Sequence, residues 1–125
     1  MSKVLLVDDI PEYVAMMNLL LPDGLRGDSA FSYEQALEKL SQSKYDLAIV
    51  DIRLKDEDEG NKDGLKILSW MRENSRDTKV IMISAYQGFE FRIEALAMGA
   101  LFFLEKPIHP ESFREAIIKA LTGKL

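Results

Sequence analysis

Several short apolar runs in this sequence end abruptly in side chains that could do chemistry. The residues that follow these runs are Asp8 with Asp9, then Asp51, then Ser84, then Glu105 with Lys106. Carboxylate oxygens are ligands that Mg²⁺ prefers, and a carboxylate can also act as a nucleophile. A hydroxyl and an ammonium group can hold phosphoryl oxygens, and phosphoryl transfer mostly needs positioning and charge neutralisation. These residue types together are suited to a carboxylate that attacks phosphorus.

The elements that must position these side chains alternate along the chain. Runs of four to six apolar residues without polar alternation are typical of strands that are buried on both faces. Segments with helical spacing of apolar residues lie between the runs and follow the last one. Five strand–helix repeats of this kind predict a doubly wound α/β fold, with a parallel sheet, helices on both faces and right-handed crossovers. The predicted strands cover residues 4–7, 27–31 (the weakest), 47–50, 80–83 and 101–104.

Local signals mark where the helices begin and end. Ser32 with Gln35 fits a capping box, Asp63 is a candidate cap for the third helix, and Pro110 suits the first turn of the fifth. Gly99 is expected to lie near the end of the fourth helix. The apolar positions that mark the five helices are Val14, Met17, Leu21; Ala36, Leu37, Leu40; Leu65, Leu68, Met71; Phe89, Ile93, Leu96, Ala97; and Phe113, Ala116, Ile117, Ala120, Leu121.

The order of the strands decides whether the polar side chains meet. In open sheets of this class, ligands bind outside the carboxyl ends of the strands, where the strand order reverses. With the order 2-1-3-4-5, the first and third strands are neighbours at that point, and Asp8, Asp9 and Asp51 converge on one pocket. Ser84 and Lys106 would flank it. Three carboxylates this close repel one another, so we expect a divalent cation and the Lys106 ammonium to compensate their charge.

Composition limits the classes of function that remain. A length of 125 residues fits one domain, residues 1–125. The sequence has no cysteine, which excludes disulfides, thiolate metal sites and a cysteine nucleophile. A net charge of −5 argues against direct nucleic-acid binding, which needs a basic face. No apolar run approaches 18 residues, so we expect a cytoplasmic protein without a membrane span.

The sequence closely resembles the receiver domain of two-component response regulators. The matching motifs occur in the family's order and cover nearly the whole chain: VLLVDD at 4–9, IVD ending at Asp51, Asp63-Gly64, Ile83-Ser84-Ala85, Gly99-Ala100 and Lys106-Pro107. The resemblance implies a flavodoxin-like (βα)5 three-layer sandwich. It also implies a signalling role in a phosphorelay, with at most slow self-dephosphorylation in place of enzymatic turnover.

The resemblance implies a role for each matching residue of the pocket. Asp51 would accept a phosphoryl group from the phosphohistidine of a sensor histidine kinase or a phosphotransfer protein. Mg²⁺ would be bound directly by Asp9, by Asp51 and by the backbone carbonyl of Arg53, and by Asp8 largely through water. Lys106 would hold a phosphoryl oxygen.

The resemblance also implies a conformational switch. Ser84 would swing toward the phosphate and Phe103 would rotate inward, changing the surface of the fourth helix, fifth strand and fifth helix. In the family this surface docks partners or dimerises, so a homodimer is one expected outcome. Permanent burial of Phe103 in the core is the alternative. The Lys106–Pro107 bond would be cis, which proline permits, and His109 is expected to be a capping or surface residue.

The loop after Asp51 departs from the family pattern. Lys55 stands where proline is expected, and residues 56–62 (DEDEGNK) lengthen the loop by several residues. One interpretation is a mobile, solvated loop. The other is that its four acids alter partner choice or metal affinity, steering a basic partner. Screening by salt would keep the effect on Mg²⁺ modest unless the loop folds over the pocket.

Two further positions bear on the lifetime of a phosphorylated Asp51. Arg53 and Tyr86 stand where the family has residues flanking the path of the hydrolytic water, and because both are bulky we expect a long phosphorylated lifetime. A phosphatase with an aspartate nucleophile needs an acid two residues later, where Arg53 stands. Nucleotide binding is not favoured either, because the sequence has none of the glycine-rich motifs that bind nucleotide phosphates. A phosphorylation-independent interaction module with the receiver fold stays open as an alternative.

Overall fold

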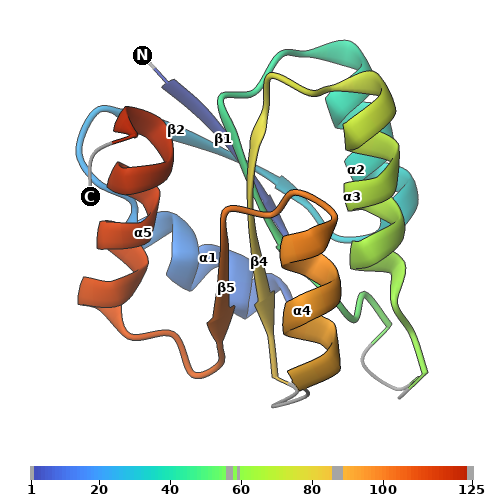
Figure 1. Ribbon diagram of the computed structural model, residues 1–125. Helices are drawn as coiled ribbons and strands as arrows, with labels where there is room; N and C mark the ends of the chain where they lie inside the picture. The colour runs from blue at the N-terminus through green and yellow to red at the C-terminus, as the bar shows by residue number, and fades with distance from the viewer. Residues whose placement is uncertain (1, 56–57, 59, 86–88, 124–125) are drawn as a thin grey trace.

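A sheet of five parallel strands forms the centre of the computed structural model, which describes residues 2–55, 58, 60–85 and 89–123 (Figure 1). The strand order is β2-β1-β3-β4-β5, and each neighbouring pair is parallel. The predicted fold class and strand order are therefore confirmed. The strands are β1 (Ser2–Val7), β2 (Leu25–Ala30), β3 (Leu47–Asp51), β4 (Lys79–Ser84) and β5 (Phe102–Glu105).

Helices cover both faces of the sheet and complete three layers. In Figure 1, α1 and α5 lie on one side of the strands, and α2, α3 and α4 lie on the other. The buried side chains accordingly form two core clusters, one on each face of the sheet. The helices are α1 (Pro11–Leu20), α2 (Tyr33–Gln42), α3 (Asp63–Asn74), α4 (Phe89–Ala97) and α5 (Pro110–Thr122).

The central strands explain the unbroken apolar runs of the sequence. Successive residues of a strand point to opposite faces, so a strand with helices on both sides needs apolar residues at every position. In β1, Leu5 and Val7 join the core beneath α2, α3 and α4, whereas Val4 and Leu6 join the core beneath α1 and α5. Because each of these apolar runs ends at the end of its strand or one residue before it, the residue that follows the run lies at the carboxyl end of the strand.

Most of the predicted helix ends agree with the structure. Ser32 caps α2, its Oγ accepting a hydrogen bond from the backbone N–H of Gln35 at 3.1 Å. The Gln35 side chain returns the contact one residue further back than in a standard capping box, accepting from the N–H of Phe31 at 2.8 Å. Pro110 is the first residue of α5. Gly99 has a φ of +106° two residues after α4 ends, a conformation that favours glycine.

The sequence-based expectations for β2 and α4 need correction. β2 begins two residues earlier than predicted and ends one residue earlier, because it is an edge strand whose half-exposed residues give no apolar run. On α4, Ile93 and Leu96 are 52% and 40% exposed, whereas Ala95 is buried. Phe91 and Met98 pack against the core beside it. The apolar residues that mark α4 in the sequence thus lie partly on its outer surface.

A membrane span was not expected from the sequence. Among the described residues, no helix combines the length and the apolar character that crossing a bilayer requires.

Candidate functional site

The fold brings the carboxyl ends of β1 and β3 together at the point where the strand order reverses. Val7 pairs with Val50 in the ladder between these strands. The N–H of Asp8 continues the β1–β2 ladder by donating to the carbonyl of Ala30 at 3.1 Å. Asp51 is the last residue of β3. Asp8 and Asp51 therefore leave the sheet side by side.

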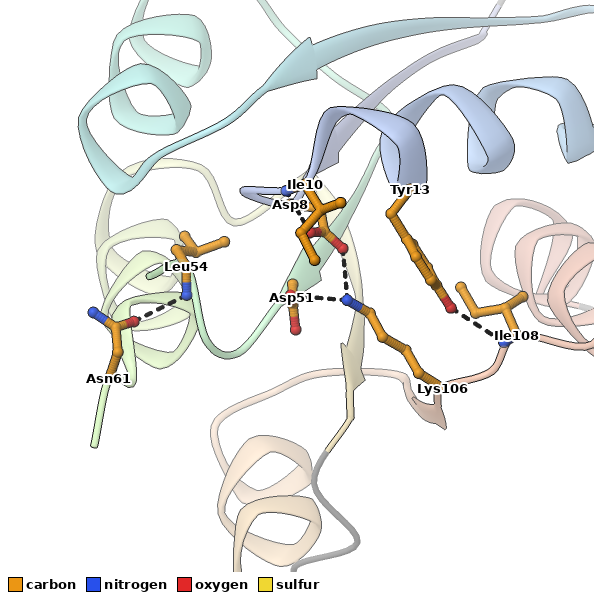
Figure 2. A network of polar contacts seen from close by, with 8 residues as sticks. All are labelled: Asp8, Ile10, Tyr13, Asp51, Leu54, Asn61, Lys106 and Ile108. Carbon is orange, nitrogen blue, oxygen red and sulfur yellow. Dashed lines mark hydrogen bonds and ion pairs between the residues drawn. The ribbon is translucent and has the colours of Figure 1, made fainter. Parts of the chain in front are cut away.

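Three carboxylates and one ammonium group meet at this edge. Carboxylate oxygens of Asp8, Asp9 and Asp51 all lie within 4.8 Å of one another. Lys106 Nζ donates to Asp8 Oδ2 at 2.8 Å and to Asp51 Oδ2 at 3.1 Å (Figure 2). Asp8 is fully buried and Asp51 is only 5% exposed. The structure thus brings together the four charged residues that the sequence placed at one pocket.

Ser84 is the last residue of the strand next to β3, and Lys106 follows the strand after that. Asp51 pairs with Ile83, so Ser84 is the next residue beyond Asp51 along the neighbouring strand. The N–H of Lys106 donates to the carbonyl of Ser84 at 2.9 Å, which extends the β4–β5 ladder. Ser84 is buried. Phe103 is half-buried on β5 and packs against the core beneath α2, α3 and α4.

Burial and crowding change the protonation of the pocket. Burial, with the adjacent Asp8 carboxylate, raises the pKa of Asp51 to about 7, although Lys106 acts in the opposite direction. Burial also raises the pKa of Asp8, against the hydrogen bonds that it accepts from Lys106 and from the N–H of Ile10. Burial opposes charge on Lys106, but Asp51 and Asp8 outweigh it and raise the pKa of Lys106. Burial and crowding therefore disfavour full ionisation of Asp51 and Asp8, even with the lysine beside them.

The donor set of the pocket fits a divalent metal ion. Three carboxylates against one ammonium leave two negative charges when all four groups are ionised, the charge of one Mg²⁺. The carboxylate oxygens are hard ligands of the type that Mg²⁺ prefers. The residues present therefore match the cation that the sequence predicts.

Gly64 allows a close approach of two backbone segments behind the site, which the sequence alone does not reveal. Its N–H donates to the carbonyl of Ile52 at 2.8 Å, which brings the first turn of α3 against the residues that follow β3. A Cβ at this position would collide with the carbonyl oxygen of Asp51 and would lie 2.6 Å from Cα of Ile52. Only glycine allows this close approach of two backbones.

Asn61 organises the long loop after Asp51 and corrects the predicted cap of α3. Its Oδ1 accepts a hydrogen bond from the N–H of Leu54 at 2.9 Å (Figure 2). It also accepts one from the N–H of Asp63 at 3.0 Å. Asp63 is the first residue of α3 and not its cap; the N-cap position is Lys62. An asparagine two residues before a helix start is a known signal for such a turn.

Backbone hydrogen bonds join the described residues of the long loop. The N–H of Asp58 donates to the carbonyl of Lys55 at 2.9 Å, and the N–H of Asn61 donates to the carbonyl of Asp58 at 3.0 Å. Lys62 then reaches α4, its Nζ lying 5.1 Å from the ring centroid of Phe91. Contacts of these described residues therefore link the loop's end to α4. Asp56, Glu57 and Glu59, and also Tyr86, lie outside the described residues.

The structure also places the remaining residues that the sequence analysis named. Arg53 is half-exposed just after β3. His109 is exposed at the N-cap position of α5, and within the described residues its side chain makes no cap hydrogen bond. The Lys106–Pro107 peptide bond is cis, as expected.

Tyr13, which no sequence motif singled out, lies with its ring centroid 4.1 Å from Lys106 Nζ.

The doubly wound sheet and the acidic pocket at its switch point define the CheY-like class of α/β domains. The family model of the response regulator receiver domain matches residues 4–118. The chain therefore belongs to the response regulator receiver family. Receiver domains of response regulators are signalling domains of two-component systems.

Individual proteins with similar sequences or folds agree with this assignment. Response regulator protein PilR of Pseudomonas aeruginosa is 33% identical over 121 residues, covering 96% of this chain and 26% of PilR. The chain thus spans about a quarter of the length of this curated relative. The beryllofluoride-activated NtrC4 receiver domain dimer has a TM-score of 0.88 at 28% identity, covering 98% of both chains. A CheY-like receiver from Methanospirillum hungatei JF-1 also scores 0.88, at 25% identity, over 98% of this chain and 95% of that one.

Proposed function

We propose that residues 1–125 form one phosphoacceptor receiver domain of a two-component phosphorelay, with Asp51 as the acceptor. The donor would be the phosphohistidine of a sensor histidine kinase or a phosphotransfer protein. The observation that carries the proposal is the Lys106 ammonium shared between Asp8 and Asp51, inside a cluster of three carboxylates. This arrangement combines a nucleophile with a cation that can receive phosphoryl charge.

The metal ligands of the proposed site are Asp9, Asp51 and the backbone carbonyl of Arg53, with Asp8 acting largely through water. Both carboxylate oxygens of Asp8 already accept hydrogen bonds, Oδ1 from the N–H of Ile10 at 3.0 Å and Oδ2 from Lys106. These contacts support an indirect role for Asp8. When bound, Mg²⁺ would neutralise negative charge on the acids and on the phosphoryl oxygens.

The proposed step transfers one phosphoryl group without oxidation or reduction. A carboxylate oxygen of Asp51 forms a bond to phosphorus, while the bond from phosphorus to the donor atom breaks and its electron pair leaves with the donor. With acetyl phosphate as donor, the leaving group is acetate and no proton has to move. Lys106 stays protonated and passes from the Asp51 carboxylate to a phosphoryl oxygen.

The proposed output is a change in the surface formed by α4, β5 and α5. Ser84 and Phe103 would rearrange together, biasing two packed states that differ by a few kcal/mol. β5 is an edge strand, and Ile93 and Leu96 are apolar side chains exposed on α4. Exposed apolar residues beside an unpaired strand edge favour association. A homodimer through this surface is one expected form of the output.

The proposed setting is the cytoplasm, with proteins as partners. A net charge of −5 disfavours direct contact with nucleic acid by this domain. The acids of the loop after Asp51 favour a basic partner over an acidic one.

Phosphoryl uptake by the isolated chain tests the proposal. The protein is incubated with acetyl phosphate and Mg²⁺ and followed by intact-mass spectrometry. We expect one added phosphoryl group in the wild type and in Asp77→Asn, which replaces an exposed aspartate between α3 and β4. We expect none in Asp51→Asn. Equal uptake by Asp51→Asn would refute the assignment of the acceptor.

A phosphoryl analogue separates the proposal from its main alternative. Beryllofluoride with Mg²⁺ should change the amide spectrum or the oligomeric state of the wild type and leave Asp51→Asn unchanged. A wild type that does not respond to either reagent, but still binds its partners, would favour the phosphorylation-independent interaction module.

A further inference from the structure

The side chain of Tyr13 connects α1 to the segment between β5 and α5. Its ring centroid lies 4.1 Å from Lys106 Nζ, and its hydroxyl oxygen accepts a hydrogen bond from the N–H of Ile108 at 3.2 Å (Figure 2). Ile108 follows Lys106 by two residues and is buried. One half-buried tyrosine therefore contacts both the ammonium group and the backbone of this segment.

The contacts around the ammonium group restrict its position. A lysine ammonium has three N–H donors on a flexible four-carbon chain. Asp8 Oδ2 at 2.8 Å and Asp51 Oδ2 at 3.1 Å each accept a hydrogen bond from it. The face of the Tyr13 ring, which attracts a cation through its quadrupole, is the third close neighbour. The location of Nζ is thus set by the ring as well as by the two acids.

We propose that Tyr13 is a positioning residue for phosphoryl transfer to Asp51, because its ring keeps the Lys106 ammonium beside the acceptor. This inference rests on the proposed function. Once an oxygen of Asp51 is bonded to phosphorus, the ammonium has to pass to a phosphoryl oxygen. During that exchange its contacts with Asp8 and with the Tyr13 ring remain. Tyr13 therefore acts through Lys106, and the ring is the part of the side chain that matters.

Two substitutions separate the ring from the rest of the side chain. Tyr13→Phe keeps the ring and removes the acceptor for the N–H of Ile108. Tyr13→Leu keeps an apolar side chain and removes the ring as well. With acetyl phosphate and saturating Mg²⁺, we expect Tyr13→Leu to be phosphorylated about three- to tenfold more slowly than the wild type. Tyr13→Phe should recover the rate to within about twofold of the wild type.

A matched control and a spectroscopic signature distinguish positioning from a structural role. Tyr33, the first residue of α2, is also half-buried against the core, so Tyr33→Leu is the control and should keep the wild-type rate. The side-chain NMR signals of Lys106 should show a ring-current shift in the wild type and in Tyr13→Phe. Tyr13→Leu should lose that shift. Thermal unfolding checks that each variant is folded at the assay temperature.

The outcomes separate failure of this inference from failure of the proposed function. A wild type that takes up no phosphoryl group overturns the proposed function, and this inference with it. Uptake by the wild type with an equal rate in Tyr13→Leu overturns only the role of Tyr13. An equal loss of rate in Tyr13→Phe and Tyr13→Leu, or in Tyr33→Leu, would also overturn it, because the effect would then not come from the ring beside Lys106.

Discussion

The first turn of α3 touches the backbone of the proposed phosphoacceptor: Gly64 lies so close to Asp51 that a Cβ would collide with the carbonyl oxygen of Asp51. The N–H of Gly64 also donates to the carbonyl of Ile52, the next residue. The backbone of Asp51 is thus held in place both by β3 and by its contact with the first turn of α3.

Replacing Gly64 with alanine should therefore damage both stability and the site. Overpacking in a tight interior typically costs about 1–3 kcal/mol, and here the backbone that must move carries Asp51. We expect Gly64→Ala to lower the free energy of unfolding by that amount in urea titrations and to slow phosphoryl uptake. Gly60→Ala is the matched control, because its Cβ would meet its nearest neighbour at 3.6 Å. Equal stability of the two variants would contradict the prediction.

Asn61 should contribute to stability through its side-chain oxygen. Asn61→Ala leaves the N–H groups of Leu54 and Asp63 without that acceptor, and a lost partner for partly buried donors costs about 1–3 kcal/mol. Faster amide exchange at these two residues would locate the effect. Asn61→Asp retains an acceptor oxygen and should lose less. Asn74→Ala, which removes an exposed contact within α3, serves as the control.

The stability of the metal-free protein should fall as the pH rises from 5 to 8. The pKa of Asp51 is about 7 in the folded chain against an ordinary value of 3.8. Between these values the folded state binds a proton that the unfolded state does not, so raising the pH favours unfolding. The raised pKa of Asp8 acts in the same direction. Lys106, whose pKa is raised, keeps its charge throughout this range and adds no slope.

The size of this pH effect follows from the pH range, from 5 to about 7, over which folded Asp51 keeps a proton that the unfolded chain has lost. At 1.36 kcal/mol for each pKa unit, we expect a loss of about 2–3 kcal/mol between pH 5 and pH 8 in urea titrations with a chelator present. Asp51→Asn should flatten the profile and be the more stable protein at pH 8. Mg²⁺ should stabilise the wild type more at pH 8 than at pH 6, because bound protons compete with the cation. A wild-type stability that rises with pH would contradict this account.

Loss of the phosphoryl group from Asp51 should be slow in the wild type. Arg53 and Tyr86 are bulky residues at the two positions that the family resemblance places beside the path of the attacking water. Replacing both with alanine should shorten the phosphorylated lifetime several-fold, measured by mass spectrometry after removal of the donor. Arg72→Ala, an exposed arginine on α3, is the control. An unchanged lifetime in the double variant would refute this role.

The central sheet and its acids could be predicted from sequence because their signals are local and unambiguous. An unbroken apolar run such as Leu47–Val50 has few alternatives to a doubly covered strand, and the residue after it must leave the sheet at one edge. Strand order then determined which acids meet. The sequence does not decide the role of Phe103, because a half-buried aromatic residue on β5 fits both a switch and a core residue.

The remaining features depend on information that spacing does not carry. Asp63 and Asn61 are both good capping residue types, and only the path of the loop decides that the amide of Asn61 turns toward the helix start. The helical period of α4 does not tell a core-facing residue from Ile93, which lies outside. Tyr13 has no signal of its own in the sequence, because its two contacts lie far along the chain.

Lys62, at the end of the long loop after Asp51, lies with its ammonium group over the ring of Phe91 on α4. Lengthening a surface loop costs little free energy, since closure entropy grows only slowly with the number of residues. A chain can therefore gain such a contact between the loop and α4 without changing any residue of the acidic pocket. If α4 shifts on phosphorylation as proposed, two receivers with the same acceptor chemistry would differ in how readily it shifts, and therefore in their sensitivity to the same input.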